Sequence, residues 1–168
     1  MAETNLTERS SQAKLNSMAV DLIDVTLTTD AEAHGNNDVI AQSIEIPNAV
    51  AVEGGSAIIQ SIMILDEDDE APSIDLIFQT DNTALASDEG EIVNISDANA
   101  RDILGFVNVS NYTDLLNCQV GIKTNIGLVV KAASTTKSIF VHAVNRSGGT
   151  YTPAATTDLK MKIGIIKD

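Results

Sequence analysis

Five consecutive carboxylates are the most prominent candidates for chemistry: Asp66, Glu67, Asp68, Asp69 and Glu70. Adjacent carboxylates repel one another, and a hard cation such as Ca²⁺ relieves that repulsion by binding oxygen ligands. The run lacks the central glycine and the distal glutamate of an EF-hand loop, and consecutive residues at a strand end point to opposite sides. We therefore expect a solvated hairpin turn and predict no metal site, although the sequence leaves open whether the turn binds a cation.

Few residues could serve as a general base or nucleophile, namely His34, His142 and Cys118. His142 shares its strand parity with Phe140 and Val144, which predicts a buried imidazole whose hydrogen bonds are satisfied. His34 lies among turn residues and should be exposed, whereas Cys118 is expected to be a small buried hydrophobe. Because no residue is placed to orient a base, we predict no catalytic residues and no enzymatic activity.

Two glycine pairs, Gly54-Gly55 and Gly148-Gly149, could be considered for a phosphate-binding loop. Neither pair is followed by Lys-Ser/Thr, and neither lies between a predicted strand and a predicted helix. Ordinary turns explain both pairs, so we expect no nucleotide and no other cofactor.

The composition excludes several classes of partner. The 168 residues include 24 acidic and 10 basic side chains, for a net charge of −14. Such a surface repels phosphate backbones and anionic lipid head groups, so we expect neither nucleic acid nor membrane as a partner. Aromatic residues make up 3% and tryptophan is absent, which weighs against a sugar-binding module or a small-molecule substrate pocket.

The charge is unevenly distributed along the chain. Twenty of the acidic residues lie within residues 1–100, whereas eight of the basic residues lie within residues 101–168. This asymmetry is one sign of a surface with two faces of different charge. The less negatively charged face would then contact a partner, while the acidic face would contact water.

The hydropathy pattern from Ala19 onward is that of an all-β domain. Residues 23–27 alternate between apolar and polar, as in a half-buried strand. Residues 57–65 are apolar at both parities, which predicts a central strand covered on both faces. Further strands are expected at residues 40–46, 74–79, 106–109, 118–123, 127–132, 139–144 and 159–166.

One short helix is expected at about residues 96–104. Ser96 is a favourable N-cap, and Gly105 is a natural residue to follow the last turn. Ile103 and Leu104 would form part of its buried side.

These elements predict an antiparallel β-sandwich or jelly-roll-like barrel of about nine or ten strands. Residues 19–168 form a single β domain in this interpretation, and residues 1–18 form an extended N-terminal arm that clasps a neighbouring subunit. Four side chains of this arm are the predicted interface residues: Leu6, Arg9, Lys14 and Leu15. The arm has no apolar stretch typical of a signal peptide, so we expect synthesis and assembly in a cytoplasm.

Several segments resemble small structural proteins encoded in the head-gene region of tailed bacteriophages, especially phages of marine and freshwater bacteria. The resemblance is carried, in order, by residues 19–30 (AVDLIDVTLTTD), 48–66 (NAVAVEGGSAIIQSIMILD), 75–81 (DLIFQTD), 95–109 (ISDANARDILGFVNV) and 124–132 (TNIGLVVKA). Residues 1–18 do not match this group. Proteins of this kind look like capsid decoration, or cement, proteins.

The resemblance implies a virion protein on the outer surface of a phage capsid, assembled in the bacterial host cytoplasm. It implies a homotrimer bound between subunits of the major capsid protein, with no small-molecule substrate. Several weak contacts in one trimer would act together through effective concentration. Two alternatives share the β fold, namely a virion-surface adhesin and a structural component of the tail or neck.

Overall fold

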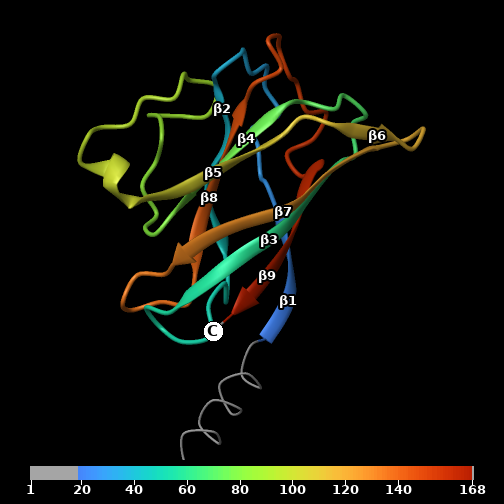
Figure 1. Ribbon diagram of the computed structural model, residues 1–168. Coiled ribbons are helices and arrows are strands. Elements are labelled where there is room, and N and C mark those ends of the chain that lie inside the picture. Colours follow the sequence, from blue (N-terminus) through green and yellow to red (C-terminus); the bar gives the residue numbers. More distant parts are fainter. Residues whose placement is uncertain (1–18, 168) are drawn as a thin grey trace, which may run out of the picture.

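The computed structural model describes residues 19–167 and consists of two antiparallel β-sheets packed face to face (Figure 1). One sheet has the order β1-β9-β3-β7-β6 and the other has the order β2-β8-β4-β5. This architecture confirms the predicted all-β sandwich. The strands are β1 (Ala19–Thr26), β2 (Val39–Ile46), β3 (Ser56–Asp66), β4 (Ile74–Gln79), β5 (Ile103–Val109), β6 (Tyr112–Asp114), β7 (Gln119–Lys131), β8 (Ile139–Asn145) and β9 (Leu159–Lys167).

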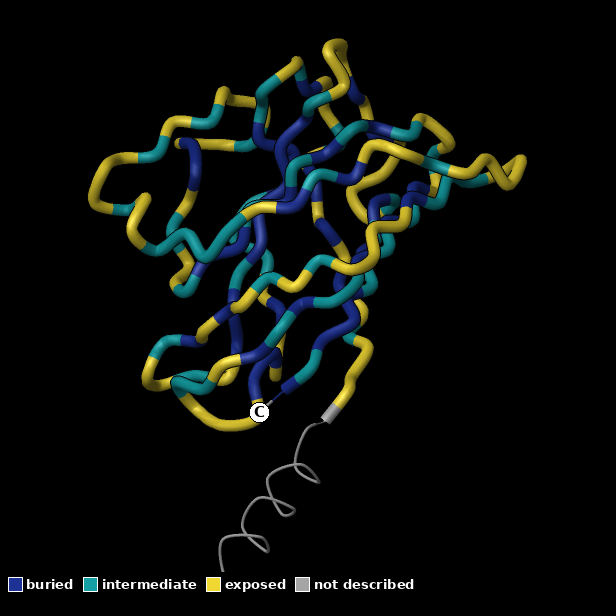
Figure 2. The backbone as a smooth tube through the Cα atoms, viewed as in Figure 1, coloured by how far each residue is buried: buried dark blue, intermediate teal, exposed yellow. Residues whose placement is uncertain are grey.

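Alternation of apolar residues along the strands produces the core between the two sheets. Strand β9 buries Met161, Ile163 and Ile165, while β4 buries Leu76 and Phe78 from the opposite sheet. Successive residues of a strand face opposite sides, so each second residue enters this layer. Figure 2 shows the resulting buried interior, with exposed residues in the connections and along β1 and β7.

The outer face of the four-stranded sheet is covered by the long connection between β4 and β5. Leu85 from this connection is fully buried against Val39 and Val144, and Val93 and Ile95 pack around them. Part of the outer face of the four-stranded sheet is therefore covered, although Phe106 at its β5 edge is 70% exposed.

Strand β3 is central in the five-stranded sheet, as predicted, because it lies between β9 and β7. The prediction that both of its faces are covered is wrong. Ile59 and Ile64 are fully buried in the core, but Ile58, Met63 and Leu65 on the other face remain partly exposed. Among residues 19–167, no connection covers the outer face of this sheet as the β4–β5 connection covers the other.

The predicted helix at residues 96–104 is only a single 3₁₀ turn, η1 (Asn99–Asp102). The prediction of Ser96 as the N-cap is wrong, because the N-cap is Ala98, which makes no side-chain capping hydrogen bond. Ser96 Oγ instead accepts the Asn99 N–H at 3.3 Å in the turn that precedes η1. The helix does not continue because Ile103 already begins β5 and pairs with Gln79 of β4.

Gly105 does not terminate a helix but lies within β5, where the pairing register with β4 shifts. Its φ of +152° is a conformation that residues with a side chain rarely adopt. A Cβ atom there would lie 2.6 Å from Leu128 Cδ1 of β7. The glycine therefore allows β5 to approach the neighbouring sheet.

The two strands predicted at residues 118–123 and 127–132 are one continuous strand, β7. The register of β7 against β3 is interrupted between Ile59 and Ser61. Asn125 and Gly127 have φ values of +57° and +67°, which bend the strand without ending it. No helix in the described part of the chain is long and apolar enough to cross a membrane.

Candidate functional site

The acidic run connects β3 of one sheet to β4 of the other, so it is not the predicted hairpin turn. Asp66 is completely buried, and its carboxylate accepts backbone N–H groups from three residues of its own loop. The distances are 3.2 Å to Asp68 N, 2.8 Å to Glu70 N and 2.7 Å to Ala71 N. Asp66 therefore organises the loop from inside, which contradicts the expectation of a wholly solvated turn.

The other four carboxylates of the run also accept hydrogen bonds, each from a different residue. Asp68 accepts the Ala154 N–H at 2.9 Å, and Glu70 accepts the Thr152 N–H at 3.2 Å. The remaining two bonds come from side chains: Gln119 donates to Asp69 and Lys160 donates to Glu67. The run thus ties the β3–β4 connection to the β8–β9 connection, β7 and β9.

These contacts give the acidic run a structural role. Within residues 19–167, no group of three or more His, Cys, Asp or Glu side chains is arranged to hold a metal ion. Burial raises the pKa of Asp66, opposed by its three N–H donors. Burial, and then the charge of Asp66, raises the pKa of Tyr112 and of Tyr151.

His142 is completely buried, as predicted, and both ring nitrogens have partners. Nδ1 accepts the Ser43 N–H at 3.0 Å, so Nε2 carries the proton and donates to Gln79 Oε1 at 2.9 Å. Burial lowers the pKa of His142 to about 4. The imidazole is therefore a neutral structural group.

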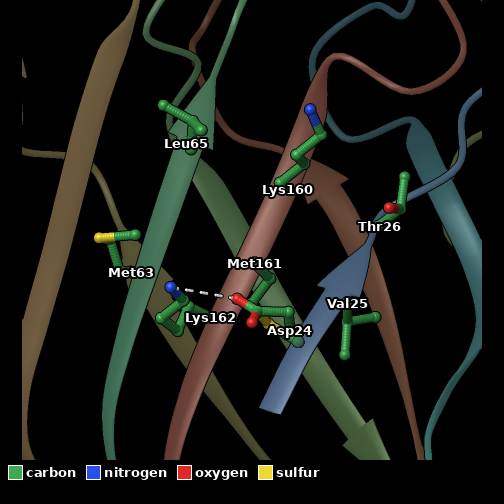
Figure 3. Close-up of a pocket in the computed structure, with 8 residues that line it drawn as sticks. All are labelled: Asp24, Val25, Thr26, Met63, Leu65, Lys160, Met161 and Lys162. Atoms are coloured by element: carbon green, nitrogen blue, oxygen red, sulfur yellow. Dashed lines mark ion pairs between the residues drawn. The ribbon is translucent and has the colours of Figure 1, made fainter. Parts of the chain in front are cut away.

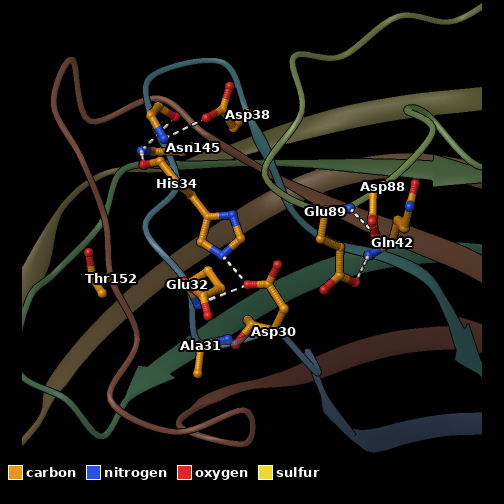
Figure 4. Close-up of polar contacts among 12 residues, drawn as sticks. Asp30, Ala31, Glu32, His34, Asp38, Gln42, Asp88, Glu89, Asn145 and Thr152 are labelled. Atoms are coloured by element: carbon orange, nitrogen blue, oxygen red, sulfur yellow. Dashed lines mark hydrogen bonds and ion pairs between the residues drawn. The ribbon is translucent and has the colours of Figure 1, made fainter.

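His34 was predicted to be exposed, and this prediction is wrong because the side chain is completely buried. Its backbone forms a two-way bridge with Tyr151, with N···O distances of 2.8 and 2.9 Å. Its Nε2 atom lies 3.0 Å from Asp30 Oδ1 (Figure 4). Tertiary contacts between two loops bury this histidine, whereas its local sequence is typical of a turn.

Asn145 organises these two loops, and the sequence analysis did not identify it. Its Nδ2 group faces three carbonyl oxygens, those of His34 at 2.9 Å, Gly35 at 3.1 Å and Gly149 at 3.0 Å. Its Oδ1 accepts the Ser147 N–H at 2.9 Å. The sequence carries one local signal for this role: Asn145 ends an apolar strand, just before a glycine-containing turn.

Cys118 is partly exposed beside the β6–β7 turn, so the prediction of a buried cysteine is wrong. The predicted interface residues Leu6, Arg9, Lys14 and Leu15 lie outside the described residues.

The outer face of the five-stranded sheet carries an exposed apolar row that crosses four strands. Val20 pairs with Ile166, Ile166 with Ile58, and Ile58 with Val129. Val20 is 78% exposed and Val129 is 62% exposed. Leu22, which is 63% exposed, extends this apolar row along β1. An exposed apolar patch of this kind is typical of a protein contact surface.

A pocket of about 250 Å³ lies towards the other end of the same face, between β1, β9 and β3 (Figure 3). Met63 and Leu65 give it apolar side chains, and Val25 and Met161, whose side chains are buried in the core, also line it. Charged and hydroxyl groups complete the lining: Asp24, Thr26, Lys160 and Lys162.

The charges around this pocket balance locally. Lys162 Nζ lies 3.3 Å from Asp24 Oδ1, and Lys160 pairs with Glu67. The chain as a whole carries a net charge of −14. This end of the outer face is therefore much less negative than the molecule as a whole.

No protein-family model matches the chain, and the search of curated proteins finds no match. The described geometry and the resemblance of the sequence segments are thus the basis for assigning a function.

Proposed function

We propose that this protein is a virion structural protein that decorates and stabilises the outer surface of a bacteriophage capsid. The exposed apolar row across β1, β9, β3 and β7 carries the proposal. Removing such a row from water on a capsid surface would stabilise the complex by about 25 cal/mol for each Å² buried, before the costs of association.

The contrast between the two sheets supports this assignment. Both sheets carry apolar side chains on their outer faces, and among residues 19–167 the β4–β5 connection covers part of the outer face of the four-stranded sheet. The apolar row of the five-stranded sheet has no such cover within the described residues and is left available. An available apolar face on a rigid sandwich favours docking against another protein.

The polar clusters support a structural role. The acidic run, His142 and Asn145 have their polar groups engaged in contacts between loops and strands. The residues best suited to chemistry are thus used to hold connections in place. This use favours a rigid structural protein over an enzyme.

The partner in this proposal is the major capsid protein, and the form that binds is a homotrimer, as the resemblance implies. The chain enters β1 at Ala19, beside Val20 of the apolar row. We propose that residues 1–18, which precede Ala19 in the sequence, contribute to the same contact.

The decisive experiment is cryo-electron microscopy of purified virions of the phage that encodes the chain. The proposal expects hundreds of copies at local three-fold sites of the head, with the apolar row against the shell. A few copies confined to the tail, neck or one vertex would overturn it and favour the adhesin or tail-component alternative.

Binding to particles that lack the chain tests the contact surface itself. Val129→Asp should weaken binding at least about tenfold, because a carboxylate would have to be desolvated at the contact. Ile92→Asp is the matched control, since Ile92 is 65% exposed but lies beside β2 of the other sheet. Equal loss of binding by both variants would contradict the assignment of the surface.

A further inference from the structure

The β4–β5 connection, residues 80–98, forms a hydrophobic cluster of its own on the outer face of the four-stranded sheet. Leu85 and Ala86 of the connection are buried against Val39 of β2 and Val144 of β8. None of these four side chains belongs to the main core between the two sheets. The connection can therefore separate from the sheet as a local unit, while the main core stays intact.

Four hydrogen bonds hold this connection to β2 and to the residues just before it. Three of them join backbone groups: Gly90 N–H to the Val39 carbonyl at 2.9 Å, Val39 N–H to the Glu91 carbonyl at 2.9 Å, and Val93 N–H to the Asn37 carbonyl at 3.2 Å. In the fourth, the Gln42 N–H donates to the side chain of Glu89, with 3.3 Å between N and Oε1. All four bonds involve residues 89–93 of the connection, so they can break together.

The same connection is strongly acidic. It contains no basic side chain and five acidic ones: Asp81, Asp88, Glu89, Glu91 and Asp97. Within residues 19–167, none of these five carboxylates forms an ion pair with a lysine or an arginine. The chain as a whole carries a net charge of −14, so the connection lies on a domain of its own sign of charge.

Glu89 is held against a carboxylate of the domain. Its side chain is partly buried beside Gln42, with Asp30 and Asp88 in its surroundings (Figure 4). Burial raises the pKa of Glu89, the hydrogen bond from Gln42 lowers it, and the charges of Asp30 and Asp88 raise it further. Asp30 lies between β1 and β2, so its repulsion of Glu89 acts between the domain and the connection.

We infer that the β4–β5 connection is a salt-controlled cover, which is closed on the sheet at high ionic strength and opens locally at low ionic strength. The apolar cluster and the four hydrogen bonds favour the closed form, while repulsion between carboxylates opposes it. The range of this repulsion falls from about 30 Å in 0.01 M salt to about 3 Å in 1 M salt. Opening uncovers Val39, Val144 and the edge of β2.

Amide hydrogen exchange of the isolated full-length chain tests this cover, and the test does not depend on the capsid assignment. The reporters are the amides of Val39, Gly90 and Val93, whose bonds join the connection to the sheet side. The amides of β9 are the reference, because β9 is paired with β1 and β3. Relative to this reference, the reporters should exchange at least about threefold faster in 0.01 M than in 1 M NaCl. An equal ratio at both concentrations would overturn the inference.

Two matched variants separate the local repulsion from the total charge of the chain. Glu89→Gln removes one charge but keeps an oxygen that can accept the Gln42 N–H, so it should reduce the salt dependence of the reporters at least about twofold. Glu53→Gln removes one charge from an exposed position in the β2–β3 connection and should leave the salt dependence close to native. An equal reduction in both variants would overturn the inference.

The apolar anchor should act independently of salt. Leu85→Ala removes a fully buried side chain of the connection, so it should speed exchange of the reporters at least about tenfold at both salt concentrations. The ratio between the two concentrations should stay native, because no charge is changed. Native exchange rates in Leu85→Ala would show that the cluster does not hold the cover, which would overturn the inference.

A change of salt distinguishes screening from ion binding. Tetramethylammonium chloride should slow exchange of the reporters as much as NaCl at the same ionic strength, because screening depends on ionic strength alone. An effect of NaCl that tetramethylammonium chloride does not reproduce would indicate a bound sodium ion and would overturn the screening mechanism.

Discussion

His142 of β8 accepts the backbone N–H of Ser43 in β2 at 3.0 Å, linking residues that lie 99 positions apart. Ser43 has a φ of +59° and lies where the β2–β8 register shifts between Ala41 and Ile44. The extra residue of a β-bulge loses its ladder partner. The imidazole therefore supplies an acceptor that the neighbouring strand cannot provide.

This relationship predicts a specific dependence of stability on pH. The folded-state pKa of His142 is about 4, below the ordinary value of 6.5. Above pH 6.5 both states are neutral and the full stability is present. As the pH falls from 6.5 to 4, the unfolded chain takes up a proton that the folded chain does not, so stability decreases by about 3 kcal/mol.

Chemical denaturation of the native chain and His142→Gln at several pH values measures this effect. The difference in unfolding free energy between the two proteins should narrow by about 3 kcal/mol between pH 7 and pH 4, because only the native chain has this titration. In NMR titrations, the His142 ring resonances should not shift between pH 7 and pH 5.5. A midpoint near 6.5 would contradict the assigned hydrogen bond.

Asp66 should be far more important for stability than the exposed carboxylates beside it. Asp66→Ala leaves three N–H groups of the loop without their acceptor, so we expect a loss of about 3 kcal/mol in unfolding free energy. Asp69→Ala removes one exposed bond from Gln119 and should cost about 0.5 kcal/mol. Equal losses in urea denaturation would show that the run acts only through its total charge.

Asn145→Asp tests the link between the His34 loop and the β8–β9 connection. The substitution keeps the size of the side chain but turns a carboxylate towards three carbonyl oxygens, so we expect a loss of about 3 kcal/mol or more. Asn117→Asp adds the same charge at an exposed position and should change stability by less than about 0.5 kcal/mol. Hydrogen exchange should show faster exchange of the His34 and Tyr151 amides in Asn145→Asp alone.

Local patterns were sufficient to predict strands whose burial alternates along the chain. Residues 139–144 and 159–166 were expected as strands and match β8 and β9 closely, because the core takes every second side chain. The burial of His142 was predictable for the same reason. Its partner Ser43 was not, because that bond depends on a bulge in a strand distant in sequence.

The incorrect predictions involve residues whose environment is set by tertiary contacts. His34 has turn-like neighbours, yet the bridge to Tyr151 and the amide of Asn145 bury it. Residues 57–65 are apolar at both parities, which predicts a strand covered on both faces, yet one face is partly exposed. That pattern is equally compatible with a face that another chain covers, which is the interpretation we propose for the five-stranded sheet.

The conformation of Leu116 makes a final prediction about the stability of the β6–β7 hairpin. Glycine adopts a φ of +78° without the steric cost that leucine incurs there, so Leu116→Gly should raise the unfolding free energy by about 0.5 to 1 kcal/mol. Leu116 is 82% exposed, so little burial is lost in the isolated chain. We therefore expect higher thermal stability, measured by scanning calorimetry. Lower stability of Leu116→Gly would instead indicate that the Leu116 side chain supports its own hairpin.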